Sequence, residues 1–273
     1  MKSQSRTPLN VACRSIRSVA ALLIASGLSA TCIGTGAAHA DDAASILRAM
    51  SDYIANQKNV SISYDSDIEI MTPDMQKIQF ASSGQLTLHR PDKLRVTRTG
   101  GYADIELVYD GANFTVSDRA RKIYGQMPAP STIDQLVDRI RDKSGIEAPG
   151  ADLLLANSYA ALMDGVYDAK HIGRGVIDGY ECEHLAFRTP DADWQIWIEP
   201  GATPIPRKYI ITTKTVTGAP QYTLRISSWK TSPDTTADAF AFKPSADMKK
   251  HEIQNLGHID EIPPGISPSG EKK

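Results

Sequence analysis

Residues Gly84–Met127 read GQLTLHRPDKLRVTRTGGYADIELVYDGANFTVSDRARKIYGQM, and they decide the fold. Apolar and polar residues alternate in Gln85–Arg90, which is the two-residue period of a half-buried strand. The same alternation recurs three more times, at Leu94 and Val96, at Ile105, Leu107 and Tyr109, and at Phe114 and Val116. Gly100-Gly101 and Asp110-Gly111 supply turns between these runs, because glycine accepts the positive φ that tight turns need. The stretch therefore predicts an antiparallel meander with one apolar face.

An Arg-Pro step ends the first strand of this meander. Pro91 cannot donate to a β-ladder, and Arg90 shares a strand face with Leu86 and Leu88. A guanidinium is thus expected at the rim of an apolar surface. The ordinary interpretation is a surface arginine whose stem covers Leu88 while its head reaches water.

Helices are expected on either side of the meander. Asp42–Gln57 carries apolar residues on one helical face, and Ser131–Lys143 does the same with Ser131 as the expected N-cap. Ala151–Met163 predicts one or two further short helices. A second set of strands then runs from Val166 to Lys230. Helices between two meanders suit either a cover laid over a sheet or a plug that fills its core, and periodicity does not separate the two.

One hairpin of the second set carries the best chemical constellation. Asp178-Gly179 is a strong two-residue turn signal between Val166–Ile177 and Tyr180–Arg188. The resulting register places three pairs opposite one another: Ile177 and Tyr180, Arg174 and Glu183, His171 and Ala186. That register puts His171, Cys182 and His184 on one face, where zinc or copper could bind. No fourth ligand is evident and the spacing matches no compact metal motif, so incidental strand residues are the favoured interpretation.

The first forty residues have the pattern of an export signal. Four basic residues precede the apolar run Val19–Leu28, and Ala38-His39-Ala40 is a small-x-small cleavage site. The run is too short to span a membrane. Cys32 raises the question of a lipoprotein anchor, but Ser29 and Thr31 before it fit that signal poorly. We therefore expect a periplasmic protein cleaved after Ala40, with no transmembrane segment left.

Composition limits the function of the remaining chain. Removing residues 1–40 leaves 26 Lys and Arg against 32 Asp and Glu, a net charge of about −6, which gives no electrostatic reason to bind nucleic acid. Only Cys182 remains, so no intrachain disulfide is possible. We expect one domain at residues 41–254 and a flexible tail at 255–273, which is rich in Pro, Gly and charge. No catalytic or phosphate-binding motif occurs, which favours a non-enzymatic protein without a cofactor.

Several motifs resemble a known superfamily. They are LHRPDKLRV and YDGANFTV in the meander, FAFKP at Phe240–Pro244, PSTIDQLVDRI at Pro130–Ile140 and WQIWIEPGATPIPRKYIITTK at Trp194–Lys214. Together they resemble the bacterial lipoprotein-localisation carriers, and more closely a set of predicted periplasmic proteins within that superfamily. The resemblance implies an α+β fold, a half-open antiparallel β-barrel of about 10–11 strands covered by short helices. In the carriers, an arginine at the matching Arg-Pro step holds the helical cover through backbone carbonyls, a role that the resemblance assigns to Arg90.

The expected function is a periplasmic, non-enzymatic carrier that holds lipid or lipoprotein acyl chains between sheet and helices. The residues expected to line its cavity are Arg90, Leu86, Leu88, Ile133, Leu136, Val137, Ile140, Leu153, Leu154, Trp194, Ile196 and Ile198. One alternative is an envelope-stress or regulatory module that recognises an envelope protein partner. A second is a metal-binding protein using His171, Cys182 and His184. The sequence leaves the cargo and the oligomeric state open.

Overall fold

The computed structural model describes residues 40–143, 148–233, 236–253, 256, 262–263 and 266. The expected export signal, Cys32 included, lies outside these residues except for Ala40, and so does most of the expected tail. The elements in chain order are α1 (Ala40–Ala55), β1 (Asn59–Met71), β2 (Lys77–His89), β3 (Lys93–Gly100), β4 (Asp104–Tyr109), β5 (Asn113–Asp118), β6 (Ile123–Pro128), α2 (Ile133–Lys143), the 3-10 helix η1 (Ala151–Leu154), α3 (Ser158–Met163), β7 (Asp168–Ile177), β8 (Tyr180–Arg188), β9 (Ala192–Ile198), β10 (Pro206–Thr213), β11 (Gln221–Lys230), the 3-10 helix η2 (Ala237–Phe240) and β12 (Lys249–His251).

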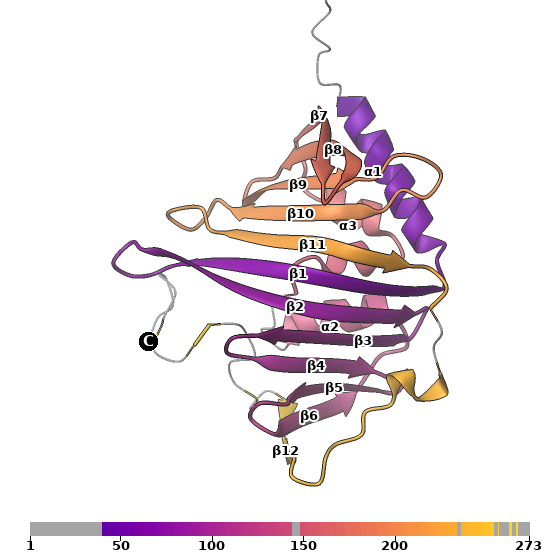
Figure 1. Ribbon diagram of the computed structural model, residues 1–273, viewed down its shortest axis with the longest axis vertical. Coiled ribbons are helices and arrows are strands. Elements are labelled where there is room, and N and C mark those ends of the chain that lie inside the picture. The colour runs from indigo at the N-terminus through magenta and orange to yellow at the C-terminus, as the bar shows by residue number, and fades with distance from the viewer. Residues whose placement is uncertain are drawn as a thin grey trace, which may run out of the picture. The chain divides into compact units, whose positions relative to one another are not determined.

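The described strands form one open sheet in the order β12-β6-β5-β4-β3-β2-β1-β11-β10-β9-β8-β7 (Figure 1). Every neighbouring pair is antiparallel except β12 with β6. The predicted open antiparallel sheet with short helices is therefore confirmed. It has 12 strands rather than ten or eleven, because the short C-terminal β12 adds itself to the edge at β6.

Strand pairing gathers the alternating apolar residues of the meander into rows across the sheet. Leu88 pairs with Val60 on one side and Leu94 on the other. Leu94 in turn pairs with Tyr109, and Tyr109 pairs with Phe114. Because side chains of directly paired residues lie on the same face, this row forms a continuous apolar strip on which a helix can pack.

Two apolar clusters bury this face under different helices, and α2 and α3 lie behind the sheet in Figure 1. The first cluster joins α2 to strands β1–β5, and Leu256, from the expected tail, is buried in it. The second joins α1, η1 and α3 to strands β8–β10. Leu224 and Trp229 pack against both clusters, so the apolar face continues from one half of the sheet to the other.

The register of the β7–β8 hairpin differs from the expected one at a single place. Ile177 pairs with Tyr180 and Arg174 with Glu183, as the two-residue turn predicts, but His171 pairs with Leu185 instead of Ala186. A bulge between His171 and Gly173 inserts one extra residue, and Gly173 has φ +127°. A shift of one residue moves a side chain to the opposite face of the strand.

Across the residues that the structure describes, no helix has both the length and the apolar character that a membrane span requires.

Candidate functional site

Helix α2 is a strongly amphipathic cover on the meander. Its apolar side chains Ile133, Leu136, Val137 and Ile140 are buried in the first cluster. Its N-cap is Thr132, one residue after the expected Ser131. The Gln135 N–H donates to the Thr132 hydroxyl at 3.2 Å, and the side-chain oxygen of Gln135 accepts from the Ser131 N–H. This reciprocal pattern, close to a capping box, explains why the helix begins after Thr132.

Three hydrogen bonds attach the start of α2 and the segment before it to the meander. The Ile133 N–H donates to the Pro91 carbonyl at 2.9 Å. The Tyr109 hydroxyl donates to the Pro130 carbonyl at 2.5 Å, and the Arg139 guanidinium donates to the Pro128 carbonyl at 3.0 Å. The helix is thus anchored to the strand end that carries the Arg-Pro step.

Polar contacts also join α2 to the segment around η1. Arg141 forms an ion pair with Asp152 at 2.9 Å. The Asp134 carboxylate accepts from the Ala156 N–H with both oxygens at 3.2 Å. These groups are partly exposed to solvent, so each contact contributes little to stability, and the attachment of α2 depends mainly on its apolar face.

Arg90 lies close to the start of this cover, and two of its nitrogens are unsatisfied. Its Nε and Nη2 atoms are buried and make no hydrogen bond to any described residue. Burial lowers the pKa of the guanidinium from its ordinary value, and the charge of Asp134 on α2 opposes that shift. The next residue, Pro91, contacts the cover directly, because its carbonyl accepts from the Ile133 N–H. In this conformation Nε and Nη2 do not form the bonds to backbone carbonyls that the resemblance assigns to Arg90.

The residues expected to line a cavity divide between the two clusters. Leu86, Leu88 and the four apolar residues of α2 lie in the first cluster, with Leu154 packed at its border. Leu153, Trp194, Ile196 and Ile198 lie in the second. All ten cluster members are at most 8% exposed. The described conformation is therefore closed, with these side chains packed against one another.

Helix α1 is a second cover, and the cavity predicted from the sequence includes none of its residues. Ala43, Leu47, Met50 and Ile54 are between 0% and 1% exposed and pack on Trp194 and its neighbours in the second cluster. The 3.6-residue pattern of this helix was visible in the sequence. Its position over β7–β9, more than a hundred residues away in the chain, was not, because long-range contacts leave no local signal.

The three candidate metal ligands do not come together. His171 Nε2 lies 2.7 Å from the Glu183 carboxylate, on the opposite strand face from His184, as the bulge requires. His184 instead bonds to Gln195 at 2.9 Å and stacks on Trp197. Within the described ranges, no group of three His, Cys, Asp or Glu residues could hold a metal ion. The common face expected for the three residues was wrong.

The thiol of Cys182 is also unsuited to nucleophilic chemistry. It is 0% exposed, and burial raises its pKa to about 11. Since the thiolate is the reactive form, this cysteine behaves as a small buried hydrophobe at neutral pH.

The sequence model of a family described as "Predicted periplasmic protein (DUF2092)" matches residues 43–254. The chain belongs to this family. The resemblance to predicted periplasmic proteins is thereby confirmed, and the family description supports a periplasmic location for this DUF2092 protein. Comparison with curated proteins finds no significant match.

Solved structures similar to this DUF2092 protein share little sequence with it. A conserved protein from Thermus thermophilus has TM-score 0.46 and 11% identity, covering 77% of this chain and 99% of its own. The Mycobacterium tuberculosis lipoprotein LppX has TM-score 0.41 and 13% identity, with coverage of 72% and 99%. MucB, in its Pseudomonas aeruginosa complex with MucA, has TM-score 0.40 and 13% identity, with coverage of 76% and 62%.

Proposed function

We propose that this protein is a periplasmic carrier that binds an acyl chain between the meander and helix α2. The observation that carries the proposal is the pairing of an amphipathic helix with an apolar sheet face, close to an arginine whose buried Nε and Nη2 atoms lack acceptors. The helix hides an apolar surface long enough for a linear chain. Displacing it would expose that surface without breaking any strand pair of the sheet.

The free energy needed to displace α2 is similar to the free energy gained by burying an acyl chain. Exposing the four apolar side chains of α2 costs about 6–12 kcal/mol in total, at roughly 1.5–3 kcal/mol each. Each methylene of a bound chain contributes about 0.8 kcal/mol when it is buried. A chain of about 8–15 methylenes therefore offsets the displacement of α2.

Arg90 would favour the displaced state. In the closed state its unpaired nitrogens carry a desolvation cost, because a buried donor without an acceptor loses its hydrogen bonds to water. Once α2 moves, these nitrogens regain water or meet an oxygen of the cargo. Arg90 thus destabilises the closed state, so that a chain of ordinary length suffices to open it.

Lipid binding to the purified protein tests the proposal. The protein is stripped of lipid, incubated with saturated fatty acids of 8 to 16 carbons, and examined by native mass spectrometry. One chain per protein is expected, with affinity rising steeply with length. If the delipidated protein binds no chain, or several chains without any length dependence, the carrier function is wrong.

A second candidate function, recognition of an envelope protein partner, is favoured by the free edge of the sheet. Strand β7 ends the sheet order, and no strand of the described residues pairs with its outer side. Four of the large apolar residues that are exposed belong to β7 and its surroundings: Tyr167 (64%), Ile172 (51%), Val176 (66%) and Tyr180 (46%). An extended peptide could add to such an edge.

Site-specific cross-linking distinguishes this candidate from the first. A photo-reactive residue at Val176 should give one discrete protein adduct in envelope extracts if the edge binds a partner. Met75, which is 55% exposed in the β1–β2 turn, is the matched control position. Equal adduct patterns at the two positions would contradict partner recognition at β7.

A further inference from the structure

A cavity of about 320 Å³ lies beside α1, on the half of the sheet that α2 does not cover. One wall is a single stripe of α1, formed by Asp42, Ser45, Ile46 and Ala49 at helical spacing. The facing wall comes from β7, β8, the end of β9 and the loop that follows it. The volume is at the lower end of the range for small-molecule sites.

The body of the cavity is apolar and its walls are well ordered by packing. Ile198 from β9 is 0% exposed and forms part of the second cluster, while Ile46 packs against that cluster from α1. Pro200 and Pro204 contribute rigid apolar surface and have no N–H group to donate. An apolar body of a few carbons therefore fits here.

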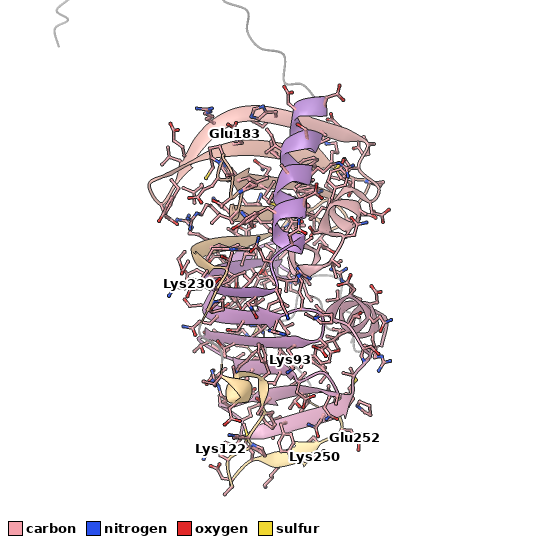
Figure 2. All side chains as sticks on the ribbon, turned by 90° about the vertical axis from the view of Figure 1, so that its right-hand side faces the viewer. Lys93, Lys122, Glu183, Lys230, Lys250 and Glu252 are labelled. Carbon is pink, nitrogen blue, oxygen red and sulfur yellow. The ribbon has the colours of Figure 1, made fainter. Side chains whose placement is uncertain are left out.

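Two carboxylates face the cavity and are held in fixed positions. Glu183 accepts from Arg174 Nε at 3.1 Å through one oxygen and lies 2.7 Å from His171 Nε2 through the other. Glu199 is bonded to Arg207 at 2.9 Å through one oxygen. Figure 2 shows Glu183 beside the N-terminal half of α1. Because Arg174 and Arg207 fix these side chains from outside the cavity, they do not have to reorganise when a ligand enters.

Other side chains of the cavity can also accept hydrogen bonds. The tautomer of His171 that donates from Nε2 to Glu183 presents Nδ1 as an acceptor. The Ser45 hydroxyl already donates to the Asp42 carbonyl at 2.9 Å. Among the described residues, the Asp42 carboxylate has no ion-pair partner, and it lies at the exposed end of the cavity. These side chains therefore favour a ligand that brings hydrogen-bond donors and positive charge.

We propose that this cavity binds a primary ammonium group carried on a short apolar chain. The ammonium has three donors and no acceptor, which complements Asp42, the free oxygen of Glu199 and Nδ1 of His171. The apolar chain lies against Ile46, Pro200 and Pro204. A carboxylate of the same length is disfavoured, because it would place like charges together without a donor. This site is separate from the acyl-chain site under α2 and does not depend on it.

Calorimetric titration with three eight-carbon probes tests the site: n-octylamine, n-octanol and octanoate at neutral pH. Octylamine should bind at least about tenfold more tightly than the other two, as expected for charge-assisted hydrogen bonds. Asp42→Asn should weaken octylamine binding by about threefold to fivefold, the effect of a partly exposed charge pair. Ala49→Leu should abolish it by filling the cavity.

Asp41→Asn is the matched control. Asp41 is an exposed carboxylate in the same first turn of α1 but does not line the cavity. Octylamine binding should be unchanged in this variant. The proposal is overturned if the three probes bind equally, if none binds, or if Asp41→Asn and Asp42→Asn weaken octylamine binding to the same extent. Equal binding of all three probes would point to the acyl-chain site instead.

Discussion

Truncation of Leu136 separates a movable cover from an ordinary core helix. Leu136 lies on α2, is 1% exposed and packs in the first cluster. Leu136→Ala should lower the free energy of unfolding by about 2–5 kcal/mol, the usual range for a buried Leu→Ala change. If cargo binding displaces α2, the same change also lowers the free energy needed to open the site.

Leu136→Ala should therefore lower the stability of the protein but raise its affinity for acyl chains. A loss of about 2 kcal/mol from the closed state would raise the affinity for a 16-carbon chain by roughly tenfold to thirtyfold. Displacement of a fluorescent fatty acid by saturated chains of 8 to 16 carbons measures the affinity, and urea unfolding measures the stability. Leu136→Ala protein should be less stable and yet bind acyl chains more tightly, with the length dependence kept.

Leu47→Ala is the control, because Leu47 is 0% exposed on α1 and belongs to the second cluster. It should lose a similar amount of stability while its affinity for acyl chains stays within about twofold. The reasoning is refuted if Leu136→Ala weakens acyl binding, or if both variants change the affinity in the same way. Either result would mean that α2 is a fixed part of the core.

Three further outcomes can be measured on single variants. Arg90→Met should raise the free energy of unfolding by about 1–3 kcal/mol, since it removes two buried nitrogens without acceptors. Arg95→Met should lower it, because the buried carboxylate of Glu106 is left unpaired. Equal losses of the two variants in urea unfolding would contradict this. Gly84→Ala should lower the unfolding free energy by about 1–3 kcal/mol, because its Cβ would lie 2.2 Å from a backbone carbonyl oxygen. In the control Gly101→Ala, no atom lies within 4 Å of the new Cβ, and the unfolding free energy should change by less than about 0.5 kcal/mol. Iodoacetamide at pH 8 should label Cys182 only after denaturation, because burial raises its pKa to about 11; rapid labelling of the native protein would show that the thiol is accessible.

The parts of the fold that local chemistry dictates could be predicted from the sequence. The alternation in Gln85–Arg90 and the glycine turns after it place β2 to β5 because every local signal agrees with the sheet. The α2 stripe from Ile133 to Ile140 was equally clear. The N-cap was missed by one residue, because both Ser131 and Thr132 are good caps and the choice depends on Gln135.

The bulge after His171 could not be predicted in the same way. Strand β7 lies at the sheet edge, and its segment around Gly173 has no alternating apolar residues to fix a register. The turn at Asp178-Gly179 sets the pairing near itself, but an extra residue farther along changes the face without a strong sequence signal. The predicted metal site depended on the expected register, so the prediction was wrong for the same reason.

The two covers differ in how much apolar surface they bury, and this difference bears on which helix a proposed acyl cargo would displace. On α1, the four inward residues from Ala43 to Ile54 are at most 1% exposed, and they extend over most of a 16-residue helix. On α2, exposure rises along the helix from 1% at Ile133 to 8% at Ile140, and the helix has 11 residues. Helix α1 also packs Ile46 and Tyr53 against the second cluster, so displacing it would expose more apolar area than displacing α2. Since Arg90, with its two unpaired nitrogens, also lies close to Asp134 of α2, the proposed opening for an acyl chain is placed on that half of the sheet, and α1 would form the wall of the smaller cavity.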